Sequence, residues 1–268
     1  MLVAALSVLF LYGAVGMLFA TWIASPPTGP GYWRLLLLLV VAGAALGLGL
    51  RLSDLEQVLP PIGAPSLVLI AVGAIALVAF GIRKGLDPER GYPVLLGVSG
   101  LAATGGLLAD PALHSARAQG VAGVLYTAGL VSTALVLGSV LVAMILAHWY
   151  LIQPRMPIAP LQRVILLFVG AELVKLPLLV GIVALHYPGW AAGEGGLLRA
   201  FVLGDALFVA VRAVLGVLSP LGLAWMTWKT VQIRSIQSAT GILYAAIVFV
   251  LFGEVISVYL SLSTGQPF

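Results

Sequence analysis

Four ionisable residues interrupt the apolar segments in the C-terminal half of the chain. Glu172 and Lys175 lie inside the apolar run VILLFVGAELVKLPLLVGIVAL, residues 164–185, and their spacing of three places them on one face of a helix. Arg212 and Glu254 interrupt two later apolar runs. Each such group costs about 3 kcal/mol to insert at the centre of a bilayer. We therefore expect the four side chains to face protein or trapped water rather than lipid.

Two carboxylates and two cations at similar depth have formal charges that cancel, and such a set is suited to proton transfer. A carboxylate that loses its water near a cation can be tuned toward either protonation state. The set could equally bind the polar head group of a quinone. A structural alternative is that one carboxylate pairs with Arg212 and the other with Lys175, which would hold three helices together. Asp205, seven residues before Arg212, either extends a proton path outward or interacts with a helix N-terminus.

A second candidate group stands at the end of a long apolar segment, where His148 and Trp149 are followed by Arg155. An unperturbed histidine has a pKa of about 6.5, which suits proton exchange with a quinone head group. The alternative is an interfacial belt of aromatic rings and cations over lipid head groups. His114 and His186 are the candidate ligands for a haem. Nothing in the sequence fixes these two at one depth, so we do not expect haem.

The sequence lacks the motifs of a self-sufficient enzyme. It contains no cysteine, which excludes disulfides, iron–sulfur ligation and thiolate metal sites from this chain. It also contains no metalloprotease, serine-hydrolase or P-loop motif. We therefore expect no catalytic metal, and a quinone is the one cofactor that the candidate residues suggest.

The composition indicates a membrane protein. Apolar residues make up 62% of the 268 positions and charged residues 8%, with a mean hydropathy of +1.16. These values exclude an ordinary soluble domain, and the expected environment is the lipid bilayer. The pI near 9.6 would suit nucleic-acid binding, but 11 of the 13 basic residues are spread along the expected loops. Nucleic acid is therefore not an expected partner.

The apolar segments predict the fold class. A helix rises 1.5 Å per residue, so about 20 residues cross a bilayer core of about 30 Å. We predict an all-α integral membrane protein, a single polytopic domain over residues 1–268, in which about eight transmembrane helices form a compact bundle with short loops. The expected helices cover residues 2–23, 35–50, 66–82, 92–108, 121–152, 164–185, 202–228 and 242–262.

The distribution of Lys and Arg predicts the orientation of the chain. The loops after the first, third, fifth and seventh expected helices hold eight of these residues, and the other three loops hold three. The positive-inside rule places the first set in the cytoplasm and both termini on the outer, periplasmic side. Ten Arg against three Lys, with abundant Ala, Gly and Leu, is typical of a GC-rich bacterial genome. We expect a multi-pass protein of the bacterial inner membrane.

Three functional hypotheses follow. The first is a subunit of a respiratory or other energy-transducing, electron-transfer complex, which handles quinone or protons while partner subunits carry the metals. The second is a small-solute or proton-coupled transporter, with the four charges at a midplane site and Pro177 and Pro220 interrupting helices. The third is a non-catalytic scaffold or anchor. Eight helices with polar groups in half of them are similar in outline to the membrane anchors of the polysulfide-reductase type. That resemblance is one of architecture and implies the first hypothesis.

Overall fold

The structure of the chain, a computed structural model, describes residues 2–24, 27–53, 62–87, 93–109, 120–193, 196, 199 and 204–264. Within these ranges all regular secondary structure is helical, as predicted. The N-terminal half contains α1 (Leu2–Ala24), α2 (Pro30–Leu52), α3 (Ala64–Leu86) and α4 (Pro93–Leu108). The C-terminal half contains α5 (Val121–Ile152), α6 (Ala159–Ala192), α8 (Asp205–Ala213), the π-helix η2 (Val214–Leu218), α9 (Ser219–Gln232) and α10 (Ile236–Thr264).

Seven helical segments among the described residues are long and apolar enough to cross a membrane, which indicates a multi-pass membrane protein. The α8–η2–α9 stretch counts as one of them, and α4, with 16 residues, is apolar but shorter than the rest. Large apolar side chains cover the outer face of α3, where Val68, Ile75 and Val78 are 60–70% exposed. A water-soluble protein does not expose such a continuous apolar face, whereas lipid accommodates it.

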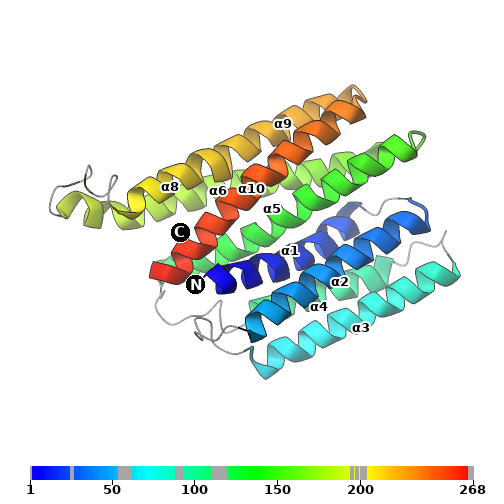
Figure 1. Cartoon of the computed structure of the whole chain (residues 1–268), viewed down its shortest axis with the longest axis horizontal. Helices are drawn as coiled ribbons and strands as arrows, with labels where there is room; N and C mark the ends of the chain where they lie inside the picture. Colours follow the sequence, from blue (N-terminus) through cyan, green and yellow to red (C-terminus); the bar gives the residue numbers. More distant parts are fainter. Residues whose placement is uncertain are drawn as a thin grey trace.

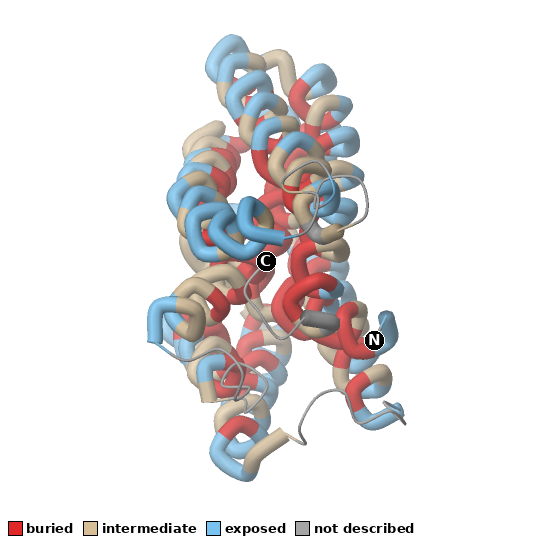
Figure 2. Tube along the Cα trace, turned by 90° about the vertical axis from the view of Figure 1, so that its left-hand side faces the viewer, coloured by how far each residue is buried: buried red, intermediate tan, exposed pale blue. Residues whose placement is uncertain are grey.

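The helices run back and forth along one direction, and the start of α1 lies at the same end of the bundle as the end of α10 (Figure 1). Helices α1 and α5 form the centre: 67% and 78% of the residues in their spanning windows are buried, against 22–39% in the other spans. Buried residues follow the inward sides of the helices, and exposed residues follow the outward sides (Figure 2). The two halves of the chain therefore join mainly through α1 and α5.

Small residues bring α1 and α5 into backbone contact. Gly16 on α1 faces Gly138 on α5, and a Cβ atom on either glycine would collide with the backbone of the other helix. Close helix approach at small residues is a usual source of packing energy in membranes, where lipid tails are as apolar as the side chains. This contact determines how the N-terminal half packs against the half that carries the buried charges.

Several helix bounds differ from the expected ones, whereas α5 matches 121–152. α2 begins at Pro30 rather than near 35, because a proline at the first helical position has its φ preset and loses no hydrogen bond. α6 covers 159–192 rather than 164–185, so His186 lies in a helix and not in a loop. α10 begins at Ile236 rather than 242, after Ser235, whose carbonyl accepts the first helical hydrogen bond from the N–H of Ala239.

The contact between α1 and α5 leads to a prediction. Replacing Gly16 with alanine would force the two backbones apart, and we expect a loss of about 1–3 kcal/mol in the free energy of unfolding, typical of overpacking. The midpoint of thermal unfolding in detergent should fall accordingly. Gly49→Ala is the matched control, because a Cβ atom there meets nothing within 4 Å. Equal midpoints for the two variants would show that α1 and α5 do not pack at Gly16.

Candidate functional site

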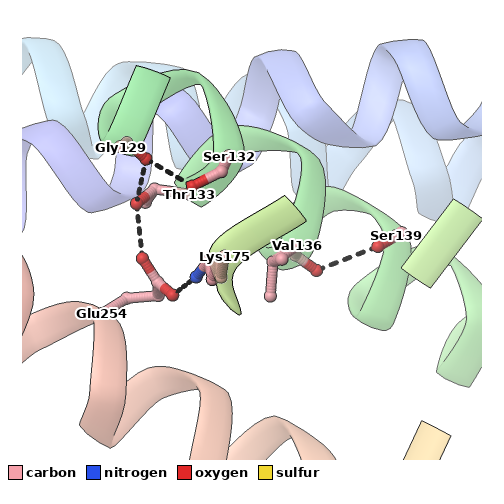
Figure 3. Close-up of polar contacts among 7 residues, drawn as sticks. All are labelled: Gly129, Ser132, Thr133, Val136, Ser139, Lys175 and Glu254. Atoms are coloured by element: carbon pink, nitrogen blue, oxygen red, sulfur yellow. Dashed lines mark hydrogen bonds and ion pairs between the residues drawn. The ribbon is translucent and has the colours of Figure 1, made fainter. Parts of the chain in front are cut away.

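A buried ion pair links two helices in the C-terminal half. Nζ of Lys175 on α6 pairs with Oε1 of Glu254 on α10, and each side chain is 1% exposed. The hydroxyl of Thr133 on α5 donates a hydrogen bond to Oε2 of Glu254 (Figure 3). Burial of two charges costs several kcal/mol per ion, and close pairing with added hydrogen bonds offsets that cost. Residues from three helices, far apart in the sequence, thus converge on one carboxylate.

Two further charges stand beside the pair. Glu172 and Arg212 are 0% and 3% exposed, and Glu172 interacts electrostatically with both Lys175 and Arg212. Among the described residues, neither carboxylate oxygen of Glu172 has a hydrogen-bond partner, and Nη1 of Arg212 has none either. We call Glu172, Lys175, Arg212 and Glu254 the charge cluster. It combines one fully paired carboxylate with one that still has hydrogen-bonding capacity.

The charge cluster lies deep in the bundle. Glu254 is ten residues before the end of α10 at Thr264, and Arg212 is seven residues after the start of α8 at Asp205. At 1.5 Å per residue these separations are about 15 and 10 Å, well inside a hydrocarbon core of about 30 Å. The nearly complete burial of all four side chains means that protein, not lipid, surrounds them.

The π-helix η2 positions Arg212, and Pro220 explains why the chain forms a π-helix here. Pro220 has no N–H to donate and its ring would clash with the carbonyl of Gly216, so a regular α-helix is disfavoured across this point. The chain instead forms a π turn, in which the backbone N–H and the hydroxyl of Ser219 both donate to the carbonyl of Val214. The expected single helix over 202–228 is therefore interrupted within the described residues.

A second glycine contact brings η2 against α10. A Cβ atom on Gly216 would lie 2.6 Å from Cα of Gly253, so the two backbones touch. Gly216 is four residues after Arg212, and its Cβ position is 3.5 Å from Cγ of Arg212. Gly253 directly precedes Glu254. The glycine pair thus sets how closely the helix of Arg212 approaches the helix of Glu254.

A groove of about 650 Å³ leads along α5 toward the cluster. It starts at Gly120, at the beginning of α5, and reaches Ser132 on α5 and Ala171 on α6. Ser132 precedes Thr133 and Ala171 precedes Glu172 in the sequence. Its wall is mainly apolar, with Thr127 and Ser132 as the hydroxyl-bearing residues. The groove has the size of a small-molecule site, and its lining extends to Leu135 on α5 and Val174 on α6.

In the described part of the chain, the second candidate group does not line one common pocket. This group consists of His148, Trp149 and Arg155. His148 is exposed near the end of α5, and Arg155 is exposed in the connection to α6. Trp149 packs its ring edge-on against Tyr32 of α2, with ring centroids 5.9 Å apart. The cavity of about 420 Å³ at this end is lined by residues from 150–158 and from 234–237, and not by these three. The packing contact with Tyr32 accounts for the position of Trp149.

The remaining sequence candidates are Asp205, His114 and His186. Asp205 is the first residue of α8, and its side chain lies outside the described part of the chain, as does all of His114. Nδ1 of His186 lies 2.9 Å from the carbonyl oxygen of Ile182, and its ring stacks on Trp190. In the ranges that the structure describes, no group of three His, Cys, Asp or Glu residues could hold a metal ion.

Three residues of the site carry no charge and were not singled out from the sequence: Thr133, Gly216 and Gly253. Thr133 is a hydroxyl in the middle of a long apolar helix, which is a weak signal because such hydroxyls usually bond to their own helix backbone. The Ser219–Pro220 step was the visible signal for the π turn. The sequence signal does not determine which helix face the π turn presents to α10, because that depends on tertiary packing.

Comparisons with protein-family models, with curated proteins and with solved structures found no match. The functional interpretation therefore rests on the charge cluster and the helices around it.

The ion pair leads to a prediction about stability. Lys175→Met or Glu254→Leu alone leaves one buried charge without its partner, and we expect each to lower the free energy of unfolding by about 3–5 kcal/mol. Lys175→Met combined with Glu254→Leu should recover a large part of that loss, because Glu172 and Arg212 still balance each other. Unfolding midpoints in detergent measure the cycle, with Lys229→Met as a control at a lysine that stacks on Trp225. Strictly additive effects would contradict direct pairing.

Proposed function

We propose that this protein transfers protons through the charge cluster, as an integral subunit of an energy-transducing membrane complex. The observation that supports this most is Glu172, a fully buried carboxylate without a hydrogen-bond partner among the described residues. A set of charges that served assembly alone would gain nothing from an unsatisfied acid, because each buried polar atom left unpaired costs free energy. A proton carrier needs such an atom, because the proton must have a place to bind.

Charge balance makes the cluster suitable for this role. With Glu172 ionised, two carboxylates balance the cations of Lys175 and Arg212. Protonation of Glu172 gives the cluster one positive charge, which the ionised Glu254 still partly offsets through its pair with Lys175. Buried ionisable residues inside membrane spans are costly and mark ion or proton pathways in many proteins. The acid can therefore be ionised in a neutral cluster, or neutral in a cluster that carries one net positive charge.

The partner subunits and the quinone are part of this proposal. The described helices are joined by short connections, and the chain has no cysteine for an iron–sulfur centre. Redox groups, if the complex uses them, would have to come from other chains. The groove between α5 and α6 is the better candidate for a quinone, because its lining includes Ala171 and Val174 on the helix of Glu172. His148 and Arg155, in contrast, are exposed at the far end of α5.

A second candidate function is proton-coupled or small-solute transport. It is favoured by the two helix irregularities next to the charges, the π turn of η2 and Pro177 inside α6, two residues after Lys175. Transporters commonly place their substrate site at interrupted helices near the bilayer midplane. The two functions differ in what the chain does alone: a transporter moves its solute in liposomes without partner subunits.

The proton function predicts the effect of Glu172→Gln, which keeps the shape of the side chain and removes its ionisation. In the intact complex, purified from native membranes and reconstituted with a pH-sensitive dye, we expect proton transfer to fall by roughly a hundredfold or more. Asp87→Asn, at the end of α3, is the matched control and should transfer protons normally. Full transfer in a folded Glu172→Gln variant rules out the proton role, and normal turnover with poor assembly would point to a scaffold.

We also propose that α4 crosses the membrane as an eighth span and that both termini lie on the periplasmic side of a bacterial inner membrane. The uneven distribution of basic residues between the two sets of loops supports this orientation. The return of α10 to the end at which α1 begins is consistent with an even number of crossings (Figure 1).

Cysteine labelling tests the orientation, since the chain has no cysteine of its own. In intact cells a membrane-impermeant maleimide should label Ser53→Cys after α2 and Ala109→Cys after α4. It should label Arg155→Cys and Asp87→Cys only after permeabilisation, because these positions follow odd-numbered spans. The inverse pattern would reverse the orientation, and labelling of positions 87 and 109 from the same side would show that α4 does not cross.

A further inference from the structure

We propose that Thr133 is a positioning residue that lets Glu254 bind or release a proton while Oε2 of Glu254 and the hydroxyl of Thr133 stay hydrogen-bonded to each other. The inference rests on the proposed proton function and extends it to the second carboxylate of the charge cluster. It starts from a hydroxyl on α5 that has two acceptors and one hydrogen. Figure 3 shows this hydroxyl between the carboxylate of Glu254 and the carbonyl of Gly129.

The two acceptors lie on opposite sides of Thr133. Its hydroxyl donates to Oε2 of Glu254 and also lies 3.1 Å from the carbonyl oxygen of Gly129, one turn earlier on α5. A threonine hydroxyl carries one hydrogen and can also accept, so it donates fully to one of these oxygens at a time. The carbonyl of Gly129 accepts a hydroxyl from Ser132 as well, at 2.7 Å, so the hydroxyls of two residues reach this oxygen.

The geometry supports two arrangements that differ by one proton. With Glu254 ionised, Thr133 donates to Oε2 while Lys175 pairs with Oε1. When a hydronium ion reaches Oε2, one of its O–H bonds breaks, the proton bonds to a carboxylate lone pair and a water molecule leaves. The new O–H donates to the hydroxyl oxygen of Thr133. The hydroxyl hydrogen then turns to the carbonyl of Gly129. One O–H bond breaks and one forms, nothing is oxidised or reduced, and the oxygens of Glu254, Thr133 and Gly129 stay hydrogen-bonded.

Two other helices contribute charged groups near Glu254. α6 contributes Lys175 and Glu172, and α8 contributes Arg212, which interacts with Glu172. α5 carries no Asp, Glu, Lys or Arg, so its contribution to this carboxylate is the hydroxyl of Thr133. A hydrogen bond to a charged acceptor is roughly twice as strong as one between neutral groups. Loss of this hydroxyl should therefore affect ionised Glu254 more than protonated Glu254.

Infrared spectroscopy of the reconstituted protein tests the inference through the C=O stretch of protonated carboxyl groups, followed as a function of pH. The Glu254 band is the one that Glu254→Gln removes. In Thr133→Val we expect this band to change frequency, and the pH at which it is half-developed to rise by about one unit, a tenfold change in proton affinity. Thr133→Ser keeps the hydroxyl and should behave as the wild type.

Ser139→Ala is the matched control, because Ser139 is a buried hydroxyl on the same helix that bonds to the carbonyl of Val136 (Figure 3). It should leave the Glu254 band unchanged. A wild-type band and midpoint in Thr133→Val, or in Thr133→Ala if the valine variant does not fold, overturns the role of Thr133. Absence of any Glu254 band in the wild type also overturns it. The proposed function fails separately, by unchanged proton transfer in Glu172→Gln.

Discussion

The arrangement of the C-terminal helices depends on the burial of the ion pair between Lys175 and Glu254. In hydrocarbon neither side chain could remain charged at acceptable cost, so the helices that carry them must stay together and exclude lipid. α5 contributes the hydroxyl of Thr133 to the same carboxylate. The contact of Gly216 with Gly253 lets η2 approach α10 at the level of Glu254. In this half of the protein, the charge pairing therefore depends on the close backbone packing of the helices that carry it.

The N-terminal half has a different composition and a different part in the structure. The acids and bases of α1 to α4 are confined to helix ends, at Arg34, Arg51, Arg83 and Lys84. Its helices pack through apolar and small residues, and α1 joins it to α5 at Gly16 and Gly138. α1 thereby covers one side of α5 while α6 and α10 cover others. The N-terminal half therefore separates one side of the helix of Thr133 from lipid.

Much of this architecture could be predicted because apolar length and isolated charges are strong signals in a membrane. The bounds of α5 and the identity of the four buried charges follow from the sequence alone. The pairing of Lys175 with Glu254 rather than with Glu172 or a second acid depends on tertiary packing, which spacing along one helix does not determine. The π turn at Val214–Leu218 and the continuation of α6 past His186 also escaped prediction. Each depends on how helix neighbours stabilise a chain that contains proline.

The contact between Lys175 and Glu254 is the central claim, and solid-state NMR measures it directly. The chain has three lysines, so ¹⁵Nζ labelling gives few signals, and side-chain carboxyl ¹³C labelling of glutamate provides the partner. The account predicts strong dipolar dephasing of the Lys175 nitrogen by glutamate carboxyl carbon in the reconstituted protein, and its marked reduction in Glu254→Gln. Dephasing that is absent in the wild type, or equal in the two proteins, would contradict the ion pair and the site built around it.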